Sequence, residues 1–296
     1  MLQLGPVPSV STMNGGESGE RYYASDKYLL PADKKETARL EVQHRVFSKA
    51  FENRLSQLPV KLKSGDQVLE SAAGTGIWTL EFLEETRKDG VTLNIQCIDI
   101  SDKQFPKEHP PEIHFSLQSV TDLPSKWNER FSYAHQRLLV LALDKSLWRK
   151  AARELFRVLK PGGWLELVEI ELQSYQLCFG PCSSKVQSLV LKMYPEKGVL
   201  IDLAQHLPSI LEESGFVDVQ CGMRKTLVGS GEYGYSSSEL ANFFRSLKRD
   251  VVSGGGYGFV GSEEEYEEIL HGAQSEWENH SEEGSITLFT ILARKP

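Results

Sequence analysis

The stretch that most constrains the fold is residues 68–78, Val-Leu-Glu-Ser-Ala-Ala-Gly-Thr-Gly-Ile-Trp, in which an apolar run leads directly into a glycine-bearing turn. Gly74 and Gly76 permit a tight turn and let a ligand approach the main chain closely. The helix expected after Gly76 would present its N-terminal N–H groups to that ligand. This order of strand, turn and helix predicts a nucleotide-binding loop in an α/β domain.

Two acidic residues, Asp99 and Glu70, indicate which class of nucleotide cofactor the loop binds. Asp99 follows a second apolar run, where an acid accepts both ribose hydroxyls of any adenosine-containing cofactor. Glu70 stands inside the loop stretch, where it would repel a pyrophosphate but suit a ligand with an ammonium and a sulfonium group. Position 79 is Thr, whereas a dinucleotide fingerprint has a third glycine there. S-adenosylmethionine is therefore favoured over NAD; the alternative for Glu70 is a carboxylate that caps local N–H groups.

Short apolar runs alternate with helical stretches from about residue 63, which predicts a parallel sheet with crossover helices. A helix is expected over 145–159, with Asp144 as its cap and a stop at 160–163. A second helix is expected over about 201–214. Strands are expected at 67–70, 94–98, 113–117, around 133–134, and at 164–170, 217–219 and 286–292.

The chain divides into three parts by composition and pattern. Residues 1–24 are rich in Gly, Ser and Pro and are expected to form a mobile tail. A helix that begins after Pro31 is expected to make residues 25–58 a helical cap, and 59–296 would form the main domain. Two stretches, about 172–200 and 229–280, interrupt the alternation and are predicted to be helical insertions that form a lid.

Charge, hydropathy and cysteine spacing exclude several classes of partner. The formal net charge of -8 has the wrong sign for a surface that binds nucleic acid. No stretch is apolar for about 18 residues and the N-terminus lacks a signal-peptide pattern, so we expect no membrane contact and a cytoplasmic protein. Cys178 and Cys182 have no second Cys/His pair at zinc-site spacing, so no metal is expected.

Several motifs together resemble those of class I S-adenosylmethionine-dependent methyltransferases. They are residues 70–76 (Glu-Ser-Ala-Ala-Gly-Thr-Gly), Asp99 and residues 159–166 (Leu-Lys-Pro-Gly-Gly-Trp-Leu-Glu). The resemblance extends to the fungal LaeA-like methyltransferases of secondary metabolism through residues 28–33, Glu36, residues 39–40, 43–44, 76–78 and 135–137, with Glu166 and Glu169. The resemblance implies a Rossmann-like sheet of seven strands in the order 3-2-1-4-5-7-6, with strand 7 antiparallel and helices on both faces.

The same resemblance implies S-adenosylmethionine as cofactor and suggests which residues bind it. These are Tyr28, Glu70, Ala72, Gly74, Thr75, Gly76, Asp99, Ile100, Gln118, Ser119, Val120, His135 and Gln136. The sequence departs from the family pattern at Ala72, which replaces a glycine, and at Gln118-Ser119, where an acidic residue usually faces the adenine amine.

His135 and His44 are the residues predicted as general base; the alternative for both is cofactor contact or helix anchoring. Arg137 and Arg39 are expected to pair with Glu166 or Glu169, or to contact substrate. The following aromatic residues could line a pocket or belong to the core: Tyr22, Tyr23, Tyr28, Trp78, Tyr233, Tyr235, Phe243 and Phe244.

These features predict an S-adenosylmethionine-dependent methyltransferase that acts on an O or N atom of a small-molecule acceptor, aromatic or polycyclic, in fungal secondary metabolism. One alternative is a LaeA-like regulatory or partner-binding protein with little catalysis, for which a nuclear location is also expected. Another is a cofactor-dependent cyclase that transfers no methyl group, and a nicotinamide dehydrogenase ranks last. The sequence determines neither the acceptor atom nor the oligomeric state.

Overall fold

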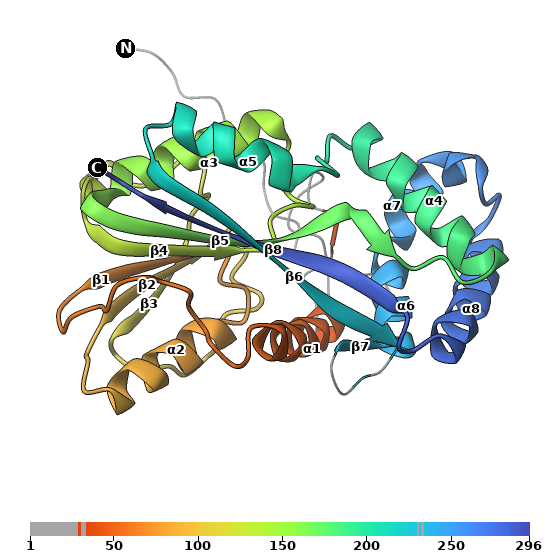
Figure 1. Cartoon of the computed structure of the whole chain (residues 1–296), viewed down its shortest axis with the longest axis horizontal. Coiled ribbons are helices and arrows are strands. Elements are labelled where there is room, and N and C mark those ends of the chain that lie inside the picture. Colours follow the sequence, from red (N-terminus) through yellow and green to blue (C-terminus); the bar gives the residue numbers. More distant parts are fainter. Residues whose placement is uncertain (1–28, 31–33, 230, 232–233) are drawn as a thin grey trace, which may run out of the picture.

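Eight strands form one mixed sheet in the order β3-β2-β1-β4-β5-β8-β6-β7 (Figure 1). The computed structural model describes residues 29–30, 34–229, 231 and 234–296. The strands are β1 (Gln67–Ser71), β2 (Asn94–Asp99), β3 (Ile113–Leu117), β4 (Phe131–Arg137), β5 (Leu159–Gln176), β6 (Val217–Gly229), β7 (Gly234–Ser236) and β8 (Gly284–Arg294).

The topology confirms the predicted sheet, with one strand added. Strands β1 to β5 pair in parallel, whereas β8 runs antiparallel to its neighbours β5 and β6. With β6 and β8 as sixth and seventh strands, the order is the predicted 3-2-1-4-5-7-6. The predicted count of seven was one too low, because β7 pairs in parallel with the end of β6. Its three residues are too few to show an alternating apolar pattern.

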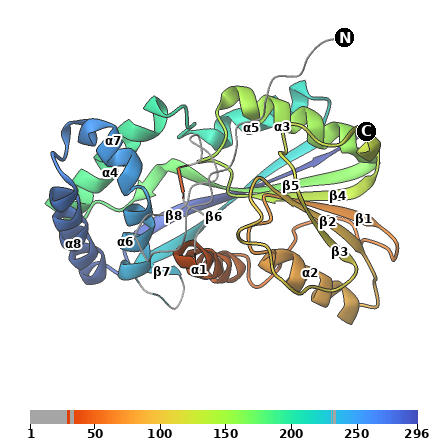
Figure 2. The same ribbon diagram turned by 180° about the vertical axis from the view of Figure 1, so that it is seen from behind.

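The helices cover both faces of the sheet and one end of it. Helices α1 (Lys34–Ala50) and α2 (Ile77–Lys88) lie on one face, and α3 (Lys145–Val158) and α5 (Leu203–Glu213) lie on the other (Figures 1 and 2). No helix of the described residues is long and apolar enough to cross a membrane. A further group gathers at the end of the sheet beyond β6 and β8: α4 (Pro181–Glu196), α6 (Ser237–Ser246), α7 (Lys248–Ser253) and α8 (Glu263–Asn279), with the 3-10 turn η2 (Gly255–Gly258).

This end group corresponds to the two predicted insertions, with one correction. Residues 172–176 continue β5 rather than begin an insertion. The predicted start of β6 at Val217 is confirmed, but its predicted end at residue 219 was wrong, because the strand continues to Gly229. Residues 220–225, Gln-Cys-Gly-Met-Arg-Lys, are largely exposed along one edge of the sheet and do not alternate between apolar and polar, so they show no strand pattern in the sequence. The predicted tail, residues 1–24, lies outside the described residues.

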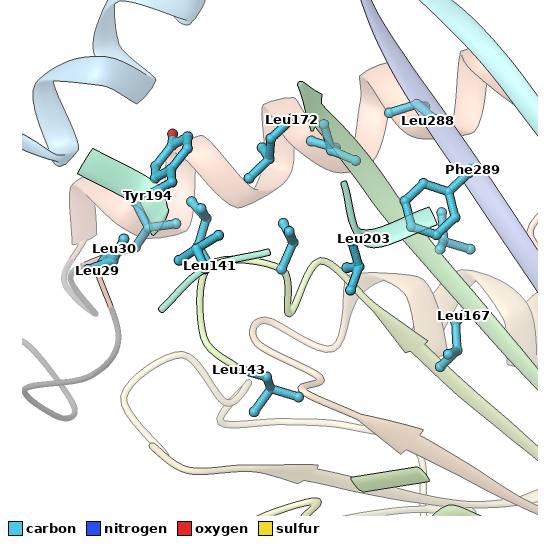
Figure 3. Packing of buried hydrophobic residues seen from close by; sticks show 14 of the residues in the cluster. Leu29, Leu30, Leu141, Leu143, Leu167, Leu172, Tyr194, Leu203, Leu288 and Phe289 are labelled. Atoms are coloured by element: carbon cyan, nitrogen blue, oxygen red, sulfur yellow. The ribbon is translucent and has the colours of Figure 1, made fainter. Parts of the chain in front are cut away.

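The strand pleat divides the apolar residues between two clusters. The larger cluster includes Leu167, Leu203 and Phe289 and packs α3, α5 and the end group against the sheet (Figure 3). The smaller cluster lies under α2 around Trp78, Ile95 and Tyr133. Within β1, the neighbours Val68 and Leu69 belong to different clusters. Successive residues of the central strands therefore face opposite helical layers, which determines which of them can reach a ligand.

Replacing Asp144 with Ala should destabilise the protein by about 1 kcal/mol, the usual cost of losing an N-cap side chain. The Asp144 carboxylate accepts hydrogen bonds from the backbone N–H groups of Ser146 and Leu147, both at 2.9 Å, at the start of α3. Asp202→Ala is the matched control, because Asp202 occupies the N-cap of α5 without a side-chain cap hydrogen bond. Urea unfolding measures both; equal losses would contradict the cap assignment.

Candidate active site

The loop between β1 and α2 turns through three left-handed residues. Ala72, Gly74 and Gly76 have φ values of 56°, 54° and 70°. The turn is tied to the next strand by two hydrogen bonds: the Ala73 N–H donates to the Ile98 carbonyl at 2.9 Å, and the Gly74 N–H donates to Oδ2 of Asp99, also at 2.9 Å. The loop therefore lies against the carboxyl end of β2.

A cavity of about 380 Å³ opens beside this loop, within the usual range for small-molecule sites. It is bounded by the carboxyl ends of β1, β2 and β4, by α1, and by residues of β5 and α6. Parallel strands place their carboxyl ends at the same edge of a sheet, which is where ligands bind in open α/β folds. The cavity therefore lies where the sequence predicts a cofactor cleft.

One wall of the cavity is apolar and is formed by residues 138–143, Leu-Leu-Val-Leu-Ala-Leu, between β4 and α3. The chain turns here through Leu138, which has a φ of 62°. The buried carboxylate of Glu169 on β5 holds this turn, because it accepts the N–H groups of Leu139 and Val140 at 2.8 and 3.0 Å. Burial raises the pKa of Glu169 to about 8. The buried Glu169 side chain therefore holds the backbone of the apolar wall in place.

Two arginines also line the cavity, and they have different partners. Arg39 of α1 forms a bidentate pair with Glu36, with nitrogen–oxygen distances of 2.9 and 2.6 Å. Arg137, the last residue of β4, donates from Nη2 to Nδ1 of His44 at 3.1 Å. The expected pairing of these arginines with Glu166 or Glu169 was therefore wrong.

Glu166 also has other partners. Its carboxylate accepts from Ser56 Oγ, from the Gln57 N–H and from the Tyr133 hydroxyl. Glu166 and Glu169 both belong to β5 but lie on opposite faces of the sheet. Glu166 contacts residues 56–57, and Glu169 contacts residues 139–140.

Most of the predicted cofactor residues line the cavity together. They come from the loop after β1, the end of β2 and the segment after β3: Ala72, Gly74, Thr75, Asp99, Ile100, Gln118, Ser119 and Val120. Tyr28 lies outside the described residues. Four others, Glu70, Gly76, His135 and Gln136, are not part of the lining.

Glu70 faces the layer beneath α2 rather than the cavity. Its side chain is buried and accepts hydrogen bonds from the Thr79 hydroxyl and, more weakly, from the Cys97 thiol. The alternative interpretation of Glu70, a carboxylate that caps N–H groups of the loop, does not describe these two hydrogen bonds, because both donors are side chains. Burial raises the pKa of Glu70 to about 7. The structure gives no contact by which Glu70 would meet a cofactor ammonium group.

Gly76 and His135 are also used for packing. A Cβ at Gly76 would lie 2.6 Å from the ring of Phe115, and its φ of 70° strains any L side chain, so a glycine is needed here for geometric reasons. The His135 ring stacks on Trp78 with centroids 3.6 Å apart, and burial lowers its pKa well below the ordinary value. His135 is thus placed as a neutral core residue, and Gln136 is fully buried on the other face of β4.

His44 also lies behind the cavity wall. Its ring is buried, bonded to Arg137 on one side and to Oε2 of Glu81 at 2.8 Å on the other. Burial and the Arg137 charge lower its pKa. This placement is helix anchoring, which was the alternative for His44, and we retain neither histidine as a general base.

Among the predicted aromatic residues, Phe243 alone of those described lines the cavity. Trp78 and Phe244 belong to the core, Tyr235 is buried, and the remaining four lie outside the described residues. Tyr175 of β5 lines the cavity and was missed. Within the described ranges no group of three or more His, Cys, Asp or Glu side chains could hold a metal ion.

Comparison with known proteins identifies the family. Residues 68–163 match a family model described as a methyltransferase domain. Over 196 residues the chain is 33% identical to the N-methyltransferase sirN of Leptosphaeria maculans, an alignment that covers 65% of this chain and 67% of that protein. The chain belongs to the S-adenosylmethionine-dependent methyltransferases.

Other relatives of this methyltransferase extend over more of the chain. It is 26% identical to the N-methyltransferase gliN of Aspergillus fumigatus over 283 residues, 91% of this chain and 96% of that one. It is also 26% identical to the secondary metabolism regulator laeA of Gibberella zeae, with 80% of each chain covered. A solved putative methyltransferase from an antibiotic pathway of Anabaena variabilis shares the fold (TM-score 0.53, 12% identity, 85% and 96% covered).

The cavity of the methyltransferase fits its cofactor, S-adenosylmethionine. Ile100 is 50% exposed on the lining, an apolar surface that a bound base would cover. The half-buried Asp99 carboxylate retains lone pairs for hydroxyl donors beyond its two backbone bonds. The Ser71 hydroxyl is buried in the lining without a hydrogen-bond partner among the described residues. Ile100 offers an apolar surface for the adenine, Asp99 an acceptor for the ribose hydroxyls, and Ser71 a hydroxyl for the amino-acid end of the cofactor.

Sequence reasoning missed the serine and most of the apolar wall. Ser71 belongs to the motif of residues 70–76, and its position directly before the turn is a signal for a ligand-facing side chain. Residues 138–143 form an apolar run that directly follows the fourth strand. An apolar run at the carboxyl end of a strand is a usable signal for a ligand wall, although it also fits a buried loop.

Replacing Glu70 with Gln should flatten the pH dependence of stability. The pKa of Glu70 rises from 4.5 to about 7 on folding, so the folded protein binds this proton more tightly. That stabilisation is complete below about pH 4.5 and is lost as the pH rises through about 7. We expect the free energy of unfolding of the unmodified protein to fall by up to about 3 kcal/mol over this window relative to Glu70→Gln.

Urea titrations at several pH values measure the effect. The control is Glu84→Gln, whose side chain is 68% exposed on α2 and pairs with Lys88. That variant should keep the slope of the unmodified protein. A Glu70→Gln slope equal to that of Glu84→Gln would show that Glu70 does not bind its proton more tightly in the folded state.

Proposed function

We propose that this methyltransferase transfers a methyl group to a nitrogen or oxygen atom of an apolar, aromatic or polycyclic small molecule of secondary metabolism. The observation that supports this is the apolar wall, formed by residues 138–143 with Ile170, Leu172 and Phe243, which faces the cavity apart from the glycine loop. Nitrogen is favoured, because the relatives sirN and gliN are named N-methyltransferases. Localisation in the cytoplasm stays a prediction.

The cofactor side of the cavity is assigned to the loop and strand ends. Asp99 would accept the ribose hydroxyls, and Ile100 would cover one face of the adenine. Gln118 or Ser119 would accept from the adenine amine in place of the usual acid. Ala72, Gly74 and Thr75 would let the main chain approach the cofactor closely, since the loop has no bulky side chain at these positions.

The cofactor supplies a methyl group already activated on a sulfonium. The chain then has to bind the acceptor, orient its attacking atom in line and exclude water, which can account for much of the rate. The apolar wall excludes water and holds an apolar body. The acids that line the cavity, Asp99 and Glu36, are bonded to backbone N–H groups and to Arg39. We therefore assign no general base and expect the acceptor atom to be nucleophilic without one.

The acceptor can be found with a cofactor that carries a deuterated methyl group. The protein is incubated with this cofactor and small-molecule extracts of a fungus, and mass spectrometry detects the labelled product. We expect a labelled apolar compound that disappears with Asp99→Asn. Cofactor binding by calorimetry without any labelled product would contradict the proposed acceptor chemistry and favour the regulatory alternative.

Replacing Asp99 with Asn should weaken cofactor binding by roughly 10- to 100-fold, the range for losing hydrogen bonds to a charged group. The amide oxygen can still accept from the Gly74 N–H, so the loop should keep its shape. Asp102→Asn is the control, since Asp102 is exposed and is not part of the lining. Calorimetry with S-adenosylhomocysteine measures both. Equal affinities for the two variants would remove Asp99 from the cofactor site.

Replacing Phe243 with Ala should raise the KM for the acceptor by about tenfold or more, because a ring contact of 1.5–3 kcal/mol is lost. The Kd for the cofactor should not change, since Phe243 belongs to α6 on the far side from the glycine loop. Phe259→Ala, which removes a half-buried ring outside the lining, controls for general loosening. A change in cofactor Kd without a change in acceptor KM would contradict the assignment of this wall.

A further inference from the structure

Arg137 brings a positive charge to the cavity without an ion-pair partner. Arg137 is the last residue of β4 and is among the residues that line the cavity; it also lines a second, smaller pocket beside His135 and Trp78. In the described part of the chain its one hydrogen bond runs from Nη2 to His44 Nδ1 at 3.1 Å, and no ion pair joins it to a carboxylate. The other cavity arginine, Arg39, is already held by Glu36. The remaining donors of Arg137 are thus available to a ligand.

The contact with His44 positions this guanidinium but does not neutralise it. Because Nδ1 of His44 accepts from Arg137, the proton of the neutral ring lies on Nε2, which donates to Oε2 of Glu81 at 2.8 Å. Burial and the neighbouring Arg137 lower the pKa of His44, which keeps the ring neutral. The nearest carboxylate in this chain of hydrogen bonds, Glu81, is therefore one ring away from Arg137.

A second polar group without a partner lies on the neighbouring strand. Ser71 pairs with Gln136 in the sheet register, so Arg137 is one residue beyond the position of Ser71 along the strands. The Ser71 hydroxyl is buried, lines the same cavity and has no partner among the described residues. Arg137 and Ser71 lie at adjacent strand ends, on opposite faces of the sheet, and both line the cavity. An anionic group bound at these strand ends would therefore have donors from both faces.

We propose that Arg137 is the carboxylate-binding residue of the cavity, with Ser71 as a second donor and His44 as the residue that positions the guanidinium. A half-buried charge without a counter-ion is costly, and a carboxylate that receives two parallel N–H bonds offsets this cost. The planar guanidinium matches a carboxylate in a way that an ammonium cannot. The inference rests on the proposed cofactor cavity, and the carboxylate belongs either to the amino-acid end of the cofactor or to the acceptor.

The test compares S-adenosylmethionine with decarboxylated S-adenosylmethionine, which differ in this carboxylate alone. Calorimetry on the full chain should show that Arg137→Gln weakens the first ligand by roughly 10- to 100-fold and leaves the second unchanged. Arg137→Lys keeps the charge and should restore part of the preference. Arg45→Gln is the matched control, because Arg45 of α1 pairs with Glu239 and is not part of the lining. It should bind both ligands like the unmodified protein.

A second arm distinguishes the two sources of the carboxylate. If Arg137→Gln binds both cofactor forms normally, apolar aromatic carboxylic acids and their matched amides are titrated onto the complex with S-adenosylhomocysteine. If Arg137→Gln no longer binds the acids but still binds the amides, the carboxylate belongs to the acceptor and the proposal is supported. Equal binding of all four kinds of ligand by Arg137→Gln and the unmodified protein overturns it.

Failure of the cofactor cavity itself gives a different result. In that case the unmodified protein would bind neither S-adenosylmethionine nor 5′-methylthioadenosine, which lacks the amino-acid end. If the unmodified protein binds both, the cavity stands and the Arg137 comparison is decisive. Thermal unfolding of each variant by circular dichroism shows whether a loss of affinity comes from unfolding, and Arg137→Lys then supplies the comparison in place of Arg137→Gln.

Discussion

The hydrogen bond from the Gly74 N–H to the Asp99 carboxylate is the interaction on which the cavity depends. It ties the left-handed turn after β1 to the end of β2 at 2.9 Å, while the other carboxylate oxygen accepts from the Ser101 N–H at 3.2 Å. Burial raises the pKa of Asp99, and hydrogen bonds from the backbone N–H groups of Gly74, Ser101 and Ile100 oppose that shift. A carboxylate has about four acceptor positions, so the residue that shapes the loop can also bind ribose hydroxyls.

The pleat of the central strands decides which residues reach this cavity. In the register of β1 and β4, Glu70 lies opposite His135 and Ser71 lies opposite Gln136. Glu70 and His135 are covered by α2, whereas Ser71 stands at the strand end and faces the lining. Arg137 shares the face of His135, lies two residues further along β4 and is among the residues that line the cavity. Along β1 and β4, residues only one or two positions apart therefore differ in whether they pack in the core or line the cavity.

The sequence predicted the strand order, the glycine loop and Asp99 because local motifs carry them. It could not predict the face of Glu70, since Val68 and Leu69 are both apolar and a strand buried on both sides shows no alternation. It ended β6 too early because the residues of an exposed edge need no alternating apolar pattern. The anchoring of His44 depends on Arg137 and Glu81, which come from separate elements and meet through packing alone.

The distribution of buried charge explains why a cavity in an acidic protein can accept an anion. The formal net charge of -8 counts every acid of the chain, whereas the acids near the site are buried or already bonded to donors of the protein. Asp99, which lines the cavity, accepts from the Gly74 and Ser101 N–H groups. Burial raises the pKa of Glu70 to about 7 and that of Glu169 to about 8, so both tend toward the neutral form near neutral pH. Glu36 is occupied by Arg39. Among the described residues Arg137 then has no carboxylate in hydrogen-bond contact, because Glu70 and Glu81 act on it only through longer-range attraction. A bound carboxylate would supply that contact despite the overall negative charge.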